Sequence, residues 1–153
     1  MLYQWVVYVH ILAVFAFLLA HGTATAITFK LRGERQIERI RVLLDLSQSM
    51  SMLGRVSLLL LVLAGIILGF MGNWWGHGWI WTALILLVLM SVAMGVLASR
   101  PLAQARQLLA ASTTAQVDQR LSTLLAAPNP VALSVIGGVG IAIILWLMMF
   151  KPF

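Results

Sequence analysis

Four long apolar stretches dominate the pattern of hydrophobic and polar positions in this chain. They cover residues 3–29, 56–73, 79–99 and 130–150, and charged or turn-forming residues bound each of them. Each stretch is near or above the ~18–20 apolar residues that cross the ~30 Å hydrocarbon core of a bilayer, and none contains Asp, Glu, Lys or Arg. We therefore predict an all-α, integral membrane four-helix bundle in contact with the lipid bilayer.

The polar segments between the apolar stretches also have helical periodicity. In residues 34–46, apolar side chains recur every three to four positions and charged side chains fill the other face. Residues 101–127 are rich in Ala, Gln and Leu and follow the same pattern. We expect two amphipathic cytoplasmic connecting helices, which serve either as interfacial linkers or as a docking surface for a partner. Little other sequence remains, so residues 1–153 form a single membrane domain.

Basic residues are distributed unevenly among the connections. The segment between the first two stretches and the segment between the last two carry nine of the ten, whereas residues 73–78 carry none. Cytoplasmic loops are enriched in Lys and Arg, so both basic connections should face the cytoplasm. We predict a multi-pass protein of the bacterial inner (cytoplasmic) membrane with both termini on the periplasmic side. Lys151, near the C-terminus, is the one basic residue on the other side.

Composition narrows the function classes. The chain is 62% hydrophobic and 9% charged, with a formal net charge of +6, and its basic residues sit beside apolar stretches. We read them as topology determinants and expect no nucleic-acid binding. Cysteine is absent, which excludes disulfides, thiolate metal ligands and iron–sulfur clusters. All four acids lie in connections, and Ser, His and Asp follow no hydrolase spacing, so we expect no enzyme.

Small residues recur within the apolar stretches. Gly65 and Gly69 form a GxxxG pair, and Gly137, Gly138 and Gly140 cluster in the last stretch. Such positions let helices approach closely, either within one chain or between chains. We expect the protein to act by association, as a homo-oligomer or as an accessory subunit of a larger membrane complex.

Three histidines are the candidates for chemistry. His10 and His21 share one helix face but lie ~16 Å apart along the axis, too far to hold one iron together. The alternative to association is that the protein binds haem or copper, with His10, His77 and His21 as the candidate cofactor ligands. Imidazole and thioether groups suit copper, and a metal site would use His10, His77 and Met71. In the competing interpretation there is no cofactor, and His10 and His21 hydrogen-bond to neighbouring helices.

Six tryptophans gather near the predicted outer boundaries of the apolar stretches: Trp5, Trp74, Trp75, Trp79, Trp81 and Trp146. Indole rings favour the depth of the lipid headgroups, so these residues are typical of an anchoring belt. The segment 74–79 would alternatively stack against a flat cofactor.

Short motifs near the N-terminus suggest a family. The sequence His-Ile-Leu-Ala-Val-Phe at residues 10–15 is followed by His-Gly-Thr-Ala at 21–24 and by Arg-Gly-Glu-Arg at 32–35. About a quarter of the chain thereby resembles small bacterial integral membrane proteins that are distantly similar to the copper-resistance D family. The resemblance implies that a membrane-embedded histidine handles copper, and it points to His10.

Overall fold

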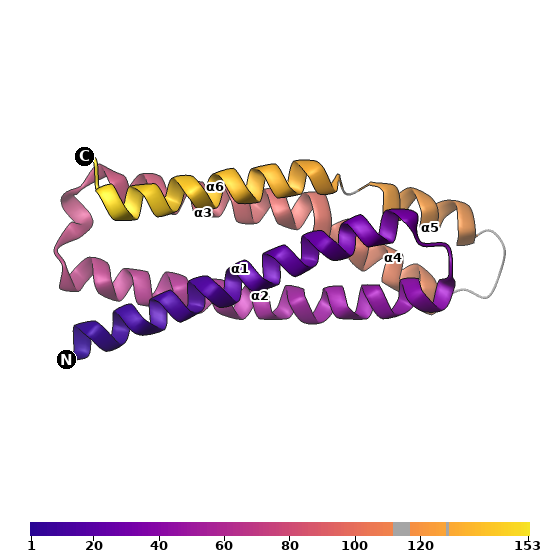
Figure 1. Ribbon diagram of the computed structural model, residues 1–153, viewed down its shortest axis with the longest axis horizontal. Helices are drawn as coiled ribbons and strands as arrows, with labels where there is room; N and C mark the ends of the chain where they lie inside the picture. The colour runs from indigo at the N-terminus through magenta and orange to yellow at the C-terminus, as the bar shows by residue number, and fades with distance from the viewer. Residues whose placement is uncertain (112–116, 128) are drawn as a thin grey trace.

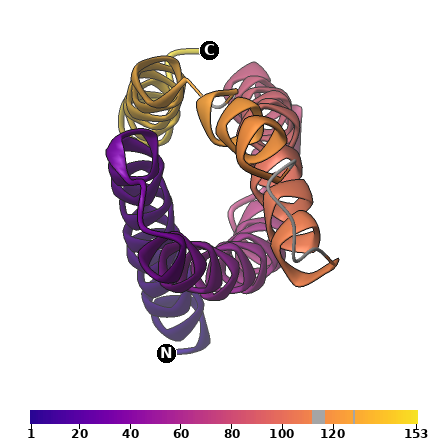
Figure 2. The ribbon, with the colours of Figure 1, turned by 90° about the vertical axis from the view of Figure 1, so that its right-hand side faces the viewer.

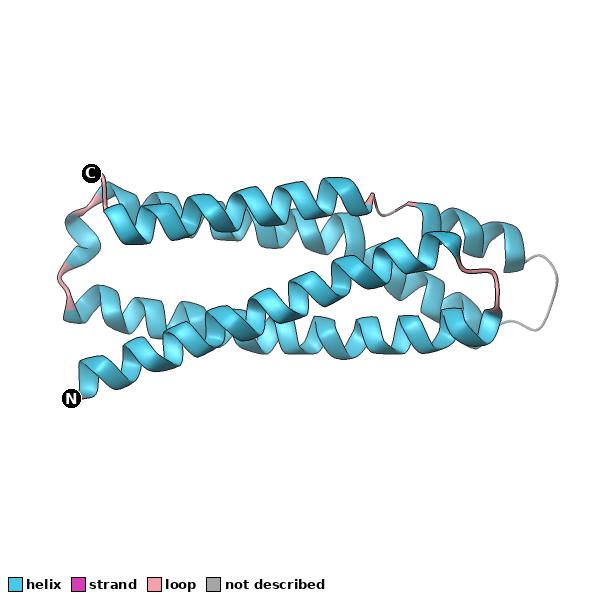
Figure 3. Ribbon diagram, viewed as in Figure 1, coloured by secondary structure: helices cyan, strands magenta, loops and turns pink. Residues whose placement is uncertain are grey.

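The computed structural model describes residues 1–111, 117–127 and 129–153, and within these ranges it contains helices and no strands (Figures 1 and 3). The long helices are α1 (Leu2–Gly33), α2 (Ile37–Met71), α3 (Gly78–Met94) and α6 (Pro130–Phe150). The shorter ones are η1 (Trp74–Gly76), η2 (Gly95–Ser99), α4 (Arg100–Ala111) and α5 (Val117–Ala126). Four helical runs are long and apolar enough to cross a membrane, which confirms the predicted all-α four-helix bundle.

The bundle is built from two helix pairs. α1 packs against α2 over most of their length, and α3 packs against α6. Further contacts between α1 and α6 join the two pairs, and the end-on view shows the helices arranged as a ring (Figure 2). Contacts between α2 and α4 join the pairs again near the other end.

Local sequence explains where the helices begin and end. At the sharp corner between α1 and α2, the Glu34 carboxylate accepts the backbone N–H groups of Arg35 and Gln36, both at 3.0 Å. The Asn129 side chain caps α6 by accepting the N–H groups of Val131 and Ala132, and Pro130 occupies the first turn. Each corner thus satisfies backbone groups that a helix end leaves without partners.

A π-helical turn, η2, joins α3 to α4. It comes immediately before Arg100 and Pro101, and proline has no N–H to donate to the carbonyl of Leu97. The wider turn keeps the helix running across this position, so α3, η2 and α4 form one continuous run from Gly78 to Ala111. The hydropathy pattern predicted that the span ends at residue 99, whereas the helix continues past it.

The connecting helices pack together as a helical head at one end of the bundle. α2 has 35 residues and is therefore ~52 Å long, well beyond the ~30 Å hydrocarbon core. Its first third, the predicted connection 34–46, packs with the end of α1 and with α4 and α5 around one buried cluster. That cluster consists of Ile27, Leu31, Ile40, Leu44, Leu102, Ala105, Leu121 and Leu125. Residues 112–116 of the second predicted connection lie outside the described residues.

Two arginines form polar contacts between the helices of this head. The Arg106 guanidinium on α4 donates to the backbone carbonyl of Leu44 on α2, and its Nε lies 3.7 Å from the Asp45 carboxylate. At the end of α1, Arg32 donates to the carbonyl of Ala126 at 3.1 Å and so satisfies the last turn of α5. The amphipathic faces of both connections are therefore turned towards each other.

The two ends of the bundle differ in character. We call the end formed by the α1–α2 corner, α4 and α5 the basic end, because most of the arginines lie there. We call the opposite end the aromatic end. It holds both chain termini and the tryptophan-rich turn between α2 and α3 (Figure 1).

Candidate functional site

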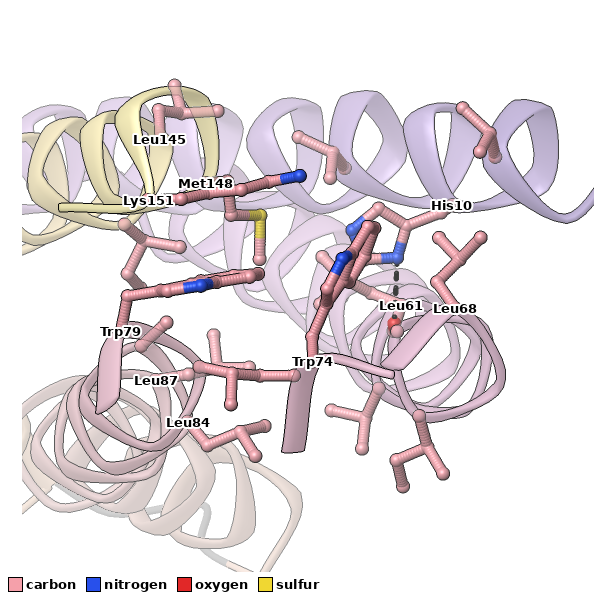
Figure 4. A pocket seen from close by; sticks show the side chains of 18 of the residues that line it. His10, Leu61, Leu68, Trp74, Trp79, Leu84, Leu87, Leu145, Met148 and Lys151 are labelled. Atoms are coloured by element: carbon pink, nitrogen blue, oxygen red, sulfur yellow. Dashed lines mark hydrogen bonds between the residues drawn. The ribbon is translucent and has the colours of Figure 1, made fainter. Parts of the chain in front are cut away.

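A cavity of about 250 Å³ lies in the half of the bundle nearest the aromatic end. α1, α2, α3 and α6 all contribute to its wall, together with the tryptophan turn η1. It extends from Trp74, Trp79 and Lys151 at its rim to Leu61 and Leu87 inside the bundle (Figure 4). Nearly all of the wall is aliphatic or aromatic, which is typical of a small-molecule site in a helical bundle.

His10 supplies the polar group inside this wall. Its Nδ1 lies 3.0 Å from the backbone carbonyl oxygen of Leu61 on α2. A carbonyl only accepts hydrogen bonds, so Nδ1 carries a proton. When the ring is neutral, this tautomer leaves Nε2 unprotonated, with its lone pair. The contact confirms the expectation that His10 hydrogen-bonds to a neighbouring helix, and it leaves Nε2 available to an occupant of the cavity.

Gly65 gives His10 access to that carbonyl. It lies four residues after Leu61, so its missing side chain uncovers the Leu61 carbonyl on the surface of α2. A Cβ at position 65 would lie 3.4 Å from the His10 Cε1 atom, at ordinary van der Waals contact distance. The first glycine of the GxxxG pair, Gly65, therefore packs against the imidazole ring of His10.

The rim carries a cation over two indole rings. The Lys151 Nζ atom lies 4.1 Å from the centroid of the Trp74 ring and 5.7 Å from that of Trp79. The two rings are 5.7 Å apart, and Figure 4 shows the lysine above them. Just beyond Lys151, the Phe153 carbonyl accepts the backbone N–H of Trp79 at 3.2 Å, so the C-terminal residues cross the start of α3.

His21 lies on the same helix but in a different setting. Its half-buried ring rests on Gly137 of α6, where any Cβ would collide with it. It does not line the cavity, and no hydrogen bond to its ring is found within residues 1–111, 117–127 and 129–153. The two histidines of α1 therefore face different helices, His10 towards α2 and His21 towards α6.

The other proposed ligands lie away from His10. His77 is exposed between η1 and α3, Met71 is 42% exposed at the end of α2, and neither lines the cavity. The described part of the chain contains no group of three or more His, Cys, Asp or Glu side chains that could hold a metal. Of the four candidate ligands, the cavity thus includes His10 alone.

Lys151 and Met148 are cavity residues that were not among the sequence-predicted site residues. The charge pattern singled out Lys151 only as the one basic residue on the other side, and no sequence pattern singled out Met148. Both line the cavity, and the Met148 sulfur faces its interior (Figure 4). The signal that could have identified Lys151 is its isolation, because it is the single Lys or Arg at the end that carries the tryptophans.

Comparison with known proteins adds no relative to this description. No protein-family model, no curated protein and no solved structure matches the chain. The functional argument therefore rests on the geometry of the cavity.

Proposed function

We propose that this is a non-enzymatic membrane protein that works by binding, and that the cavity at its aromatic end holds one small, largely apolar molecule. The observation that carries the proposal is the cavity itself, which four helices line with apolar side chains around the single imidazole of His10. An apolar cavity of ~150 Å³ in a protein core already binds benzene. A volume of about 250 Å³ has room for a larger molecule, on the order of ten carbon atoms.

A cavity-filling variant tests this function. Leu84 lines the cavity, and Leu84→Phe adds a ring to its wall. Val88, one turn further along α3, is 60% exposed on the outer surface, so Val88→Phe is the matched control. Small molecules extracted from the purified wild-type protein and identified by mass spectrometry should include one species near one copy per chain. That species should fall several-fold in Leu84→Phe and persist in Val88→Phe. Equal amounts in all three proteins would contradict the proposal.

A copper ion is a more specific candidate occupant, and the His10 geometry favours it. A haem is much larger than the about ten carbon atoms that the cavity has room for, so it would need a wider cavity than the structure shows. Metal-binding histidines commonly donate one ring N–H to a carbonyl, which fixes the ring and leaves the other nitrogen for the metal. The Leu61 carbonyl has that role here. Copper handling is also what the resemblance to the copper-resistance D family implies. On this proposal, His10→Ala removes the bound group and His77→Ala does not.

The test is a visible absorption spectrum of the purified protein, oxidised and then reduced with dithionite, together with a copper assay. A Soret band that shifts on reduction and disappears in His10→Ala supports haem. Copper that is lost in the same variant supports copper. If His10→Ala changes neither quantity, the site holds neither group.

Association with a second copy or with a larger membrane complex is the other proposal, and the exposure of α1 favours it. Only 6% of the most apolar 18-residue window of α1 is buried, against 22–28% in the other three membrane-crossing runs. Phe15 and Leu19 are among its exposed side chains, at 66% and 63%. Crosslinking in native membranes from single cysteines at these two positions should trap a partner or a dimer. Lipid-only contact would give no crosslinked product.

We also propose the bacterial inner membrane as the location, with the basic end in the cytoplasm and both termini in the periplasm. The support is charge asymmetry, because Arg35, Arg39, Arg41 and Arg100 are exposed at the basic end. Lys151 is the one Lys or Arg at the aromatic end, where the tryptophans would lie at headgroup depth.

A further inference from the structure

We propose that the occupant of the cavity is an anionic amphiphile, with a single apolar chain inside the bundle and its negative head group at Lys151. This inference rests on the proposed binding function and adds the chemical class of the ligand. Three features of the site carry it: the position of the lysine, the location of the acids, and the shape of the apolar wall.

Lys151 lies where the cavity meets the headgroup region. Its ammonium group is held over the Trp74 and Trp79 rings, 4.1 Å and 5.7 Å from their centroids, while Trp79 is only 3% exposed. Contact with the negative faces of two rings stabilises a cation and fixes its position. The rings thus hold one positive charge beside an apolar space.

No acidic side chain neutralises this charge. The chain has four acids, and Glu34, Glu38 and Asp45 lie at the α1–α2 corner and the start of α2, while Asp118 belongs to α5. All four positions are therefore at the basic end, the opposite end from Lys151 (Figure 1). Each salt bridge found among the described residues also lies at the basic end. Lys151 takes part in none of the salt bridges found among the described residues, so its ammonium group is open to an anionic partner. Charge-assisted hydrogen bonds are roughly twice as strong as those between neutral groups.

The apolar remainder of the cavity wall favours a ligand with an apolar chain. Apart from Lys151 and His10, the cavity is lined mainly by apolar side chains such as Ile80, Leu84 and Ile144. Its volume of about 250 Å³ suits one chain on the order of ten carbons and is too small for two. A carboxylate on a free single-chain acid and a phosphate on an anionic phospholipid share this chemistry.

Quenching of tryptophan fluorescence provides the test, in nanodiscs of zwitterionic lipid. The probe is 2-bromododecanoic acid, whose bromine lies beside the carboxylate and hence beside Trp74 and Trp79 when the head group is at Lys151. Its methyl ester is the uncharged match and reports quenching from the surrounding lipid. We expect saturable quenching by the acid at about tenfold lower concentration than by the ester.

Substitutions of Lys151 test whether this side chain causes the preference for the acid over the ester. Lys151→Gln should abolish the difference between acid and ester, whereas Lys151→Arg, which keeps the charge, should retain it. Lys30→Gln is the matched control, because Lys30 is an exposed lysine at the other end of the bundle. Displacement of the acid by phosphatidylglycerol would identify a phospholipid as the source of the anion, and resistance to displacement would identify a free acid.

Two results would overturn the inference and differ in their meaning. If acid and ester quench equally, with Leu84→Phe weakening both, the anionic ligand is wrong and the binding function stands. If neither probe gives saturable quenching and Leu84→Phe has no effect, both proposals are wrong.

Discussion

Glu34 illustrates how one side chain can organise a corner. Its carboxylate accepts the backbone N–H groups of Gln36 and Arg35 and lies 3.7 Å from the Arg39 guanidinium. The hydrogen bond from Gln36, with smaller contributions from Arg35 and Arg39, holds the pKa of the Glu34 carboxyl below its ordinary value. The ionised form is therefore the one that the folded corner favours.

The direction of this shift predicts a pH dependence. A group whose pKa is lower in the folded state stabilises the protein above its unfolded-state pKa, ~4.3 for Glu, and loses that contribution as the pH falls. We expect the melting temperature of the detergent-solubilised protein to fall on acidification below that value, and the fall to be smaller in Glu34→Gln. Glu38→Gln is the control, since Glu38 is exposed and makes only a 3.9 Å contact with Arg41. An identical acid response in all three proteins would contradict the prediction.

Arg106 predicts a contrast between its two contacts. Removing the charged donor to the Leu44 carbonyl in Arg106→Met should cost about 1–3 kcal/mol, because hydrogen bonds from charged groups are among the stronger ones. Asp45→Asn should cost at most ~1 kcal/mol, since the Asp45 side chain is 66% exposed and solvent screens the pair. Thermal unfolding measures both changes, with exposed Arg100→Met as the neutral control. A larger loss in Asp45→Asn would show that the ion pair dominates.

At the scale of the helices, three glycines each pack against a large side chain from another helix. Gly65 receives His10, Gly137 receives His21, and Gly140 receives the Met90 thioether. Each pair joins two different helices, so a side chain of one helix occupies the space that the other leaves open. Close approach at small residues is a general feature of membrane helix packing, and here it selects which large residue fits where.

This arrangement predicts a rescue between two helices. In Gly140→Ala the added methyl collides with Met90, and overpacking of this kind costs about 1–3 kcal/mol. Combining it with Met90→Ala, which makes room, should lower the melting temperature by less than the sum of the two single changes. Gly138→Ala is the control, because nothing lies within 4 Å of a Cβ there. If the decrease in the double variant equals the sum of the two single decreases, Gly140 and Met90 do not interact.

The helices were largely predictable from the sequence, and their partners were not. Hydropathy located the spans because a bilayer requires about 20 apolar residues whatever the tertiary structure. It could not show that residues 34–46 continue into α2 or that α3 runs on past Pro101, since both depend on packing of Leu44 and Leu102 in the head. The role of His10 was predictable as far as its hydrogen bond. Lys151 was not predicted as a site residue because its cation–π contacts with Trp74 and Trp79 form only in the folded bundle, where residues distant in sequence come together.

At the scale of the whole molecule, the separation of a basic end from an aromatic end predicts a single orientation. The chain has no cysteine, so each introduced cysteine is the only one. A membrane-impermeant thiol reagent applied to intact bacterial cells should label His77→Cys and should not label Glu38→Cys until the cells are opened. Both positions are exposed in the structure, so reactivity reports the side of the membrane. Labelling of Glu38→Cys from outside would reverse the proposed topology.

The pairing of helices also bears on how the protein is made. α1 and α2 adjoin in sequence and pack on each other, so a growing chain can assemble them as soon as both have left the ribosome. α3 packs mainly on α6, which follows only after α4 and α5. At synthesis rates of ~5–20 residues per second, α3 enters the bilayer a few seconds before its partner exists. During that interval only lipid, or a membrane chaperone, can cover the cavity-facing side of α3, because its main packing partner has not yet been made.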